Sequence, residues 1–271
     1  MSRILFINPW KFQDENAEKY TPEYEWRNGP YSLLLLATVL RQDGHKVALF
    51  DMERELVCNN GSLEKAFDRL SNVVQQMEPE FVGISFFSVQ FIEAQKIVLA
   101  VRDACNEKGL TTKIIAGGIH ATIEPESTLR DLAVDYVFVG EGEIGLRQLV
   151  EGCSIDRING LFGNKNTNIV KGDIVVELDS LPFPDWSICD YKFYSYPSYG
   201  KIGYKKSSSL DILMGRGCSY KCNFCAYPAL SKVRSHSAEY LYEQCVYMMK
   251  SFGVKGLFFT DSSLGNNIKT L

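Results

Sequence analysis

The chain has 271 residues, of which 45% are hydrophobic, so it can build the core of one large domain or two ordinary ones. Its formal net charge of −4, without any basic run, argues against nucleic acid as a partner. The eight cysteines come without a signal-peptide pattern, and the longest apolar run, residues 33–40, is far shorter than the ~20 residues that cross a bilayer; we therefore expect a cytoplasmic protein with reduced thiols and no transmembrane segment.

The first 150 residues alternate between strand and helix patterns. Strands are predicted over residues 3–8, 46–51, 81–86, 113–116 and 136–139, and helices over residues 31–42, 62–77, 90–108, 125–132 and 143–150. The second helix, for example, has apolar residues at helical spacing behind Ser62, a good N-cap. This alternation predicts an α/β fold, Rossmann-like or flavodoxin-like, with a doubly wound parallel sheet covered on both faces.

The predicted strands all end in unusual peptides. These are Asn8-Pro9-Trp10, Asp51-Met52, Gly83-Ile84-Ser85, Gly117-Gly118-Ile119-His120 and Gly140-Glu141-Gly142-Glu143. Ligands of doubly wound sheets bind outside the carboxyl ends of the strands, where glycine lets backbone approach them closely. For any single loop, a tight strand-to-helix turn is an adequate explanation, with Glu141 and Glu143 favouring a helix N-terminus. The set as a whole predicts a binding face for a large planar or nucleotide-like ligand.

Two common functions of such sheets, dinucleotide binding and phosphate acceptance, do not fit this sequence. A dinucleotide site needs Gly-x-Gly-x-x-Gly after the first strand, and residues 8–14 contain no glycine. A phospho-acceptor domain would have an acidic pair after the first strand and an aspartate at the end of the third, where glycine and serine stand instead. His120, beside a glycine pair, is expected to bond backbone or pack at a ligand edge rather than to bind a metal.

The pattern weakens between residues 152 and 206. Short strands are possible at residues 160–162, 168–170 and 174–177, followed by Leu181-Pro182-Phe183-Pro184-Asp185-Trp186 and a tyrosine-rich run. Proline and aromatic residues predict an ordered, irregular connector. Its tyrosines, at positions 191, 194, 196 and 199, are expected to pack rather than to close over a substrate.

A second strand–helix series follows the connector. A buried strand over residues 210–214 leads into a cysteine-rich loop, a helix over 237–251 has Leu241, Cys245 and Met248 on one face, and a strand over 256–260 ends at Asp261. Strand, loop, helix and strand form the opening of a (β/α) barrel, whose active site lies at the carboxyl ends of its strands.

The loop contains Cys218, Cys222 and Cys225. Three thiols within eight residues are expected to converge on a soft metal centre. Four-iron clusters normally have four cysteine ligands, so three would leave one iron open. The alternatives are a zinc site, with His236 or Cys245 added to the Cys222/Cys225 pair, a disulfide, and cysteines that bind nothing. Zinc sites usually have a second pair, and disulfides belong to exported proteins.

This cysteine spacing, with Phe224 before the last cysteine, resembles the radical S-adenosylmethionine (SAM) enzymes. The resemblance implies that the three cysteines hold a 4Fe–4S cluster whose open iron is chelated by SAM, and that Phe224 lies near the adenine. In the family the reduced cluster cleaves SAM to methionine and a 5′-deoxyadenosyl radical, using an electron donor such as flavodoxin or ferredoxin. The family often has Gly-Gly-Glu after the second barrel strand to bind the amino group of SAM; Asp261 stands there in this chain.

The glycine-rich strand ends resemble the cobalamin-binding domain that precedes the radical domain in one branch of that family. The resemblance implies that Gly83 and Ser85 border the nucleotide tail of cobalamin. Gly117, Gly118 and Thr122 would line the slot for its lower base, and Glu141 would lie near the corrin edge. Many cobalamin domains carry Asp-x-His-x-x-Gly after the first strand, but residues 10–14 here contain no histidine. Either the cobalt has no protein ligand below it or the domain has lost cobalamin.

Together these resemblances imply a cobalamin-dependent radical SAM enzyme. Its parts would be a cobalamin-binding domain at residues 1–151, a connector at 152–206 and the start of a radical SAM domain at 207–271, truncated because too few residues remain for a barrel. Methyl transfer to an unreactive centre of a small-molecule substrate is the expected activity, although some relatives catalyse cyclisation or rearrangement. The alternatives are a non-catalytic cobalamin or iron–sulfur module that senses or carries electrons, and a zinc-stabilised binding protein. No catalytic residue beyond the cofactor ligands is identified.

Overall fold

The computed structural model describes residues 1–10, 28–163, 169–197, 208–226 and 232–264. The chain divides into two compact units. The first comprises Met1–Tyr24 and Val39–Ile174, and the second comprises Glu25–Thr38 and Val175–Leu271. Each unit has a sheet of its own.

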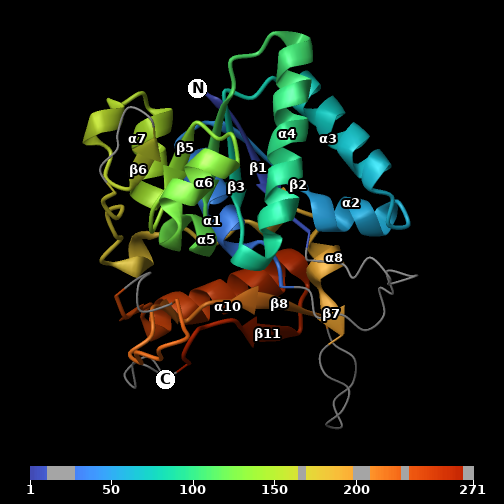
Figure 1. Ribbon diagram of the computed structural model, residues 1–271. Coiled ribbons are helices and arrows are strands. Elements are labelled where there is room, and N and C mark those ends of the chain that lie inside the picture. Colours follow the sequence, from blue (N-terminus) through green and yellow to red (C-terminus); the bar gives the residue numbers. More distant parts are fainter. Residues whose placement is uncertain (11–27, 164–168, 198–207, 227–231, 265–271) are drawn as a thin grey trace. The chain divides into compact units, whose positions relative to one another are not determined.

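The first unit is built on a six-stranded sheet in the order β2-β1-β3-β4-β5-β6 (Figure 1). Its strands are β1 (Arg3–Asn8), β2 (Lys46–Asp51), β3 (Phe81–Ser85), β4 (Lys113–Gly117), β5 (Tyr136–Phe138) and β6 (Leu161–Gly163). The first five are parallel, and β6 pairs antiparallel with β5 at the edge. The order 2-1-3-4-5 is that of flavodoxin-like folds, so the predicted doubly wound α/β class is confirmed.

Helices follow the strands along the chain. They are α1 (Tyr31–Gln42), which belongs to the second unit up to Thr38, and α2 (Met52–Cys58), α3 (Leu63–Met77), α4 (Phe91–Lys108), α5 (Ile119–Ile123), α6 (Pro125–Asp131) and α7 (Glu143–Val150), with 3-10 turns η1 (Ser88–Gln90) and η2 (Ile155–Arg157). The sequence did not predict α2 and α5, which are short and begin directly at strand ends. Helix α2 starts there because the Asp51 side chain accepts a hydrogen bond from Arg54 N, at 3.2 Å.

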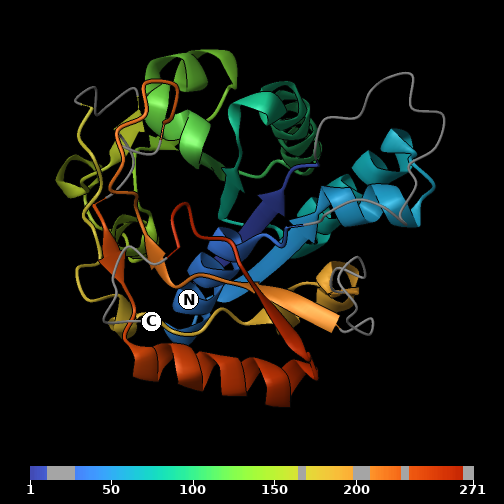
Figure 2. The same cartoon turned by 90° about the horizontal axis from the view of Figure 1, so that it is seen from below.

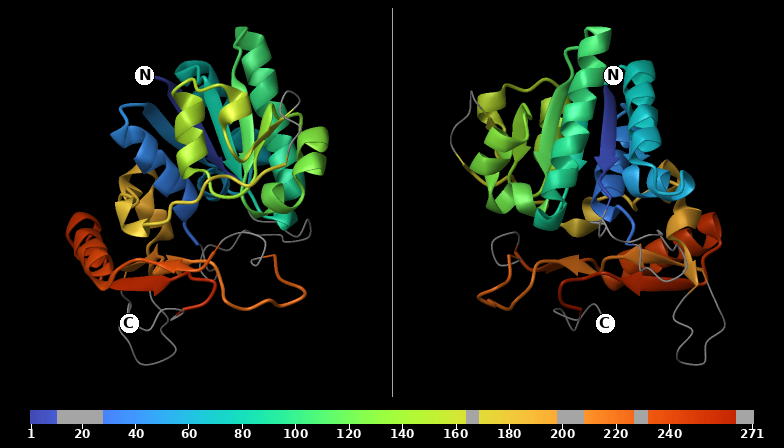
Figure 3. Two further views of the ribbon diagram at one scale, coloured as in Figure 1. Left: turned by 90° about the vertical axis from the view of Figure 1, so that its left-hand side faces the viewer. Right: turned by 45° about the vertical axis from the view of Figure 1, so that its right-hand side comes forward.

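The sheet is buried on both faces, which explains its continuous apolar strands. In β1, Leu5 and Ile7 belong to a core shared with Leu70 of α3 and Ile97 of α4. The intervening Phe6 faces the other way and is also buried. Figure 3 shows α4 lying along the sheet.

Asp135, directly before β5, connects neighbouring segments by hydrogen bonds. Its carboxylate accepts hydrogen bonds from Arg102 Nη2 at 2.6 Å, Lys113 Nζ at 3.0 Å and Ile114 N at 2.9 Å. Burial alone would raise the pKa of Asp135, but the hydrogen bonds from Ile114, Arg102 and Lys113 outweigh it and leave the pKa below its usual value. The ionised carboxylate therefore stabilises the fold.

We expect Asp135→Asn to lower the free energy of unfolding by about 1–2 kcal/mol at pH 7, since solvent partly screens the site. Because the folded-state pKa is lowered, the contribution is present above the unfolded pKa and is lost as the pH falls through the folded pKa. Urea unfolding, measured at pH 7 and at successively lower pH, should show that the difference in unfolding free energy between Asp135→Asn and wild type becomes smaller as the pH falls. Asp131→Asn is the control, because the Arg130–Asp131 ion pair lies on the surface and should contribute little to stability. An equal loss in both variants would contradict the prediction.

The second unit contains a three-stranded sheet in the order β11-β8-β7. Its elements are η3 (Leu178–Ser180), η4 (Trp186–Ile188), α8 (Tyr191–Tyr194), β7 (Tyr196–Pro197), β8 (Ser208–Ile212), β9 (Gly215–Arg216), β10 (Arg234–Ser235), α10 (Ala238–Phe252) and β11 (Gly256–Phe259). Strands β8 and β11 are parallel, with α10 between them in the chain and alongside them in space (Figure 2). Ser237 caps α10 by accepting from Tyr240 N at 3.1 Å. This is the predicted first βαβ part of a barrel.

The connector differs in detail from the prediction. The strand predicted at 160–162 is β6, whereas residues 169–177 form no strand and Asn168 lies outside the described residues. Tyr194 is buried, and Tyr191 packs against Phe252 with ring centroids 5.0 Å apart, as predicted; Tyr199 and the side chain of Tyr196 lie outside the described part. Helix α10 buries Leu241 and Met248 as predicted. No helix in the described ranges has the length and apolarity required to span a membrane.

Candidate functional site

The first candidate site lies at the carboxyl ends of β3 and β4. Ser85 and Gly117 are paired across these strands. Gly118 follows with φ +94° and ψ −169°, a backbone conformation that is essentially restricted to glycine. A Cβ on Gly118 would lie 2.7 Å from Ser85 Oγ and 2.9 Å from Phe86 N. Glycine at this position therefore lets the two strand ends close together.

Thr122 extends this cluster to β5. Its hydroxyl donates to Gly118 O at 2.8 Å and accepts from Gly140 N at 3.0 Å, so it joins the loops after β4 and β5. A Cβ on Gly117 would meet no atom nearer than 3.9 Å. The structure thus brings Ser85, Gly117, Gly118 and Thr122 together, and Gly117 has room beside it.

Gly83 and Glu141 do not belong to the cluster of Ser85, Gly117, Gly118 and Thr122. Gly83 lies inside β3, and a Cβ there would be 2.7 Å from Cδ1 of Phe6, so the packing of that ring requires glycine. Glu141 is half-buried in the loop after β5, and its carbonyl oxygen lies against Gly172. Gly83 therefore has a packing role that the sequence did not indicate. Contact of either residue with cobalamin stays a prediction.

The ends of β1 and β2 are joined by polar side chains that the sequence analysis did not assign. Asn8 Nδ2 donates to Asp51 Oδ1 at 3.2 Å. The buried amide of Gln90 donates to Pro9 O at 3.3 Å and to Trp10 O at 3.2 Å, and its oxygen accepts from Phe87 N at 3.0 Å. Gln90 stands at a helix start without any distinguishing pattern, so only the folded structure identifies it.

His120 lies in an aromatic cluster near the same edge. Its ring centroid is 5.5 Å from that of Phe86 and 5.0 Å from that of Phe91, and Nδ1 is 2.9 Å from Ser88 Oγ. Burial lowers the pKa of His120 despite the opposing charge of Glu124, so the ring is neutral at pH 7. Its Nε2 is buried without a hydrogen-bond partner in the described part of the chain. An orphaned polar atom and the open side of Gly117 make this edge compatible with a polar ligand such as cobalamin.

The second candidate site is the cysteine loop, which a two-stranded ribbon closes at its base. Strands β9 and β10 pair antiparallel, with Gly215 opposite Ser235 and Arg216 opposite Arg234. Gly217, at φ +84°, packs against the backbone of Lys232, where a Cβ would lie 2.6 Å from the carbonyl oxygen. The two ends of the loop are therefore held next to each other.

All three thiols of the loop are free. Cys218 is half-buried, Cys222 and Cys225 are exposed, and Phe224 is 94% exposed. Within the described ranges, no group of three or more histidine, cysteine, aspartate or glutamate side chains is arranged to hold a metal ion, so the thiols do not converge as the spacing predicted. Cysteine binds metals as the thiolate, so a metal bound here would release the thiol protons. Three free, soft ligands in one loop still fit an iron–sulfur cluster chemically.

Asp261 connects the end of β11 to the beginning of this loop. Its Oδ2 accepts from Met214 N at 3.0 Å and its Oδ1 accepts from Gly215 N at 2.8 Å. Burial raises the pKa of Asp261 by more than these backbone donors lower it. Both oxygens are thus used to hold the ribbon, and the role of Asp261 in SAM binding stays a prediction.

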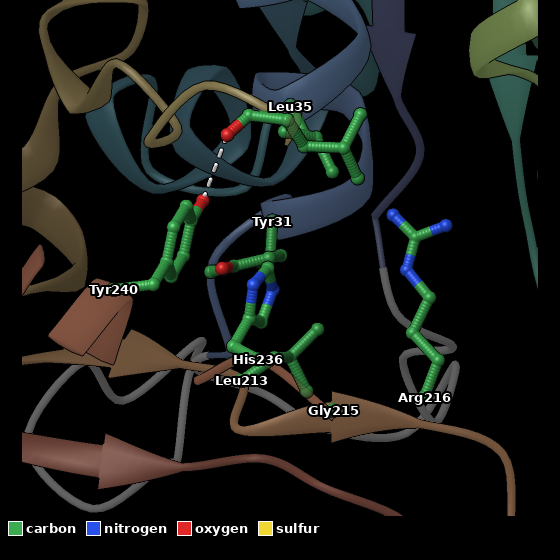
Figure 4. A pocket seen from close by; sticks show the side chains of 8 residues that line it. Tyr31, Leu35, Leu213, Gly215, Arg216, His236 and Tyr240 are labelled. Atoms are coloured by element: carbon green, nitrogen blue, oxygen red, sulfur yellow. Dashed lines mark hydrogen bonds between the residues drawn. The ribbon is translucent and has the colours of Figure 1, made fainter. Parts of the chain in front are cut away.

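Two small pockets border the ribbon. One is lined by Tyr31, Leu35, Leu181, Leu213, Gly215, Arg216, His236 and Tyr240 (Figure 4), and the other by Met214, Gly215, Arg216, Gly217, Arg234, Ser235, Asp261 and Ser263. Each has a volume of about 10 Å³. That is room for about one water molecule, so neither accommodates a nucleotide as it stands.

A known domain family covers the first candidate site. The B12 binding domain family matches residues 24–150, which include β2 to β5 and the loops after β3, β4 and β5. This match supports cobalamin as the ligand of the first unit and confirms the resemblance found in the sequence.

Proteins named as methyltransferases are among the relatives. An uncharacterized methyltransferase from Pyrococcus horikoshii is 25% identical over 253 residues, 89% of this chain and 50% of its own. Cytidylyl-2-hydroxyethylphosphonate methyltransferase from Streptomyces wedmorensis is 22% identical over an alignment of 306 positions, 98% of this chain and 56% of its own. The chain spans about half the length of these curated relatives.

Two solved enzymes share the fold. The radical SAM methyltransferase TsrM from Kitasatospora setae, with cobalamin and a [4Fe–4S] cluster bound, superposes with a TM-score of 0.67 at 18% identity, covering 98% of this chain and 48% of TsrM. The cobalamin-dependent SAM radical enzyme OxsB with aqua-cobalamin bound superposes with a TM-score of 0.72 at 19% sequence identity, covering 97% of this chain and 34% of OxsB. These similarities confirm the predicted combination of folds.

Proposed function

We propose that this chain is part of a cobalamin-dependent radical SAM enzyme that transfers a methyl group to an unreactive centre of a small molecule. One observation carries the proposal: a B12-binding domain match and a loop with three free cysteines after a barrel-type strand occur in the same chain. The relatives from P. horikoshii and S. wedmorensis and TsrM are named methyltransferases, which favours methyl transfer over rearrangement.

The residues have the following roles in this proposal. Cys218, Cys222 and Cys225 would hold the 4Fe–4S cluster, with Phe224 beside SAM. Ser85, Gly117, Gly118 and Thr122 would border cobalamin, together with Gly83 and Glu141. When bound, the cluster and cobalamin would supply the electron that cleaves SAM and the methyl group that is transferred. The Thr122 bridge in one unit and the Asp261 bonds in the other hold the loops that would carry these groups.

Other parts of the proposal follow from the same resemblance. An electron donor such as flavodoxin or ferredoxin would reduce the cluster, and the protein would work in the cytoplasm. The domain limits at residues 151 and 206 stay predictions.

The test is anaerobic reconstitution of the whole chain with iron, sulfide and hydroxocobalamin, followed by visible absorption and electron paramagnetic resonance (EPR) with and without SAM. We expect bound corrinoid and a reduced four-iron signal that shifts when SAM is added. Corrinoid without a cluster would support a cobalamin module and contradict the radical enzyme. Bound zinc with neither cofactor would contradict both assignments.

A further inference from the structure

The segment that precedes the cysteine loop in the second unit contacts the base of that loop through Asp179. Asp179 Oδ1 lies 3.0 Å from His236 Nδ1, and Ser237 N donates to both carboxylate oxygens, at 3.1 and 3.2 Å. Asp179 therefore satisfies a backbone donor where α10 begins and fixes the imidazole ring of the preceding residue.

His236 passes this restraint to the ribbon. The residue directly follows β10, is only 6% exposed and stacks on Tyr240 with ring centroids 4.0 Å apart. Its backbone N donates to Met214 O at 2.9 Å. Met214 precedes β9, and its own N–H is bonded to Asp261. The residue that leads into the cysteine loop is thus held from two sides, by Asp261 and by His236.

Further bonds hold the same segment against the loop base. Tyr240 Oη donates to Leu181 O at 3.2 Å and to Pro182 O at 3.3 Å. Arg234 of β10 donates from its guanidinium to Val175 O. Figure 4 shows His236 and Tyr240 on the side of the ribbon where Tyr31 also lies. The ribbon therefore rests on residues that precede it by more than thirty positions, with Asp179 supplying the charged contact.

We propose that Asp179 is a positioning residue for the cysteine loop. Through His236 it fixes the β9–β10 ribbon from which Cys218, Cys222 and Cys225 extend. Residues that orient metal ligands typically change metal affinity by about 10–100-fold when they are replaced. The inference rests on the proposed iron–sulfur function and adds to it a residue outside the cysteine motif.

The experiment uses the full chain, reconstituted anaerobically with iron and sulfide, with iron per chain and the EPR spectrum of the reduced cluster as readouts. Asp179→Ala and His236→Leu should each bind iron about tenfold more weakly or give a broadened, shifted EPR signal. Asp179→Asn should retain the wild-type EPR signal, because the amide oxygen of asparagine can still accept hydrogen bonds from His236 Nδ1 and Ser237 N. Ser62→Ala, which removes the N-cap of α3 in the other unit, should load iron normally.

Wild-type iron content and an unchanged EPR spectrum in both Asp179→Ala and His236→Leu would overturn the inference. If Asp179→Ala unfolds α10, as circular dichroism would reveal, His236→Leu decides, because it leaves the Asp179 bonds to Ser237 N in place. Loss of the signal in His236→Leu then supports the positioning role, and a normal signal refutes it. Failure of the wild-type chain to load a cluster would instead contradict the proposed function.

Discussion

Replacing Cys222 by alanine should abolish the iron–sulfur cluster and leave cobalamin binding intact. Cys222 is exposed, so the substitution removes a thiol without opening a cavity, and a cluster with an open iron has no spare protein ligand. We expect Cys222→Ala to retain less than about a tenth of the wild-type iron after reconstitution. The bound corrinoid, measured by its visible absorption, should stay at the wild-type level because it depends on the first unit.

Cys245→Ala is the matched control for this substitution. Cys245 is a half-buried thiol on α10, and burial raises its pKa, so it should be an inert side chain. Normal iron loading in this variant would also exclude Cys245 from the zinc site considered as an alternative. If Cys222→Ala lost iron and corrinoid together, the two cofactors would not occupy separate units as we propose.

Gly118→Ala should weaken cobalamin binding and destabilise the first unit. The conformation at φ +94° and ψ −169° costs a non-glycine residue about 1–3 kcal/mol. The added methyl group would also lie 2.7 Å from Ser85 Oγ and 2.9 Å from Phe86 N, and backbone atoms cannot move away cheaply. We expect a lower midpoint of thermal unfolding and a cobalamin dissociation constant raised at least about tenfold, or about 1.4 kcal/mol.

A substitution at the neighbouring Gly117 distinguishes an effect on cobalamin binding from an effect on stability. A Cβ on Gly117 has no neighbour within 3.9 Å, so Gly117→Ala should keep the wild-type unfolding midpoint. If Gly117 lines the cobalamin slot, the same methyl group should still weaken binding in a titration followed by visible absorption. An unchanged midpoint in Gly118→Ala would contradict the strain argument, and unchanged affinity in Gly117→Ala would remove Gly117 from the slot.

Much of the architecture follows from local sequence. The Ser62 and Ser237 caps, and glycines at the ends of α4 and α10, set helix limits within one or two residues of the prediction. The alternation of apolar strands and amphipathic helices determined the α/β class, because periodicity records which face of each element is buried. The spacing of Cys218, Cys222 and Cys225 in the sequence identified them as candidate metal ligands, since they lie within eight residues of one another.

Tertiary structure decided the roles of residues whose partners lie far away in the chain. Gly83 is required by the ring of Phe6, Gln90 bonds to Pro9 and Trp10, and Asp261 bonds to Met214 across 47 positions. No local pattern encodes such contacts, because they exist only once the strands have paired. The sequence by itself determined the class of fold and named candidate cofactor ligands. Which side chains hold the loops in place was decided by packing and by the satisfaction of buried polar groups.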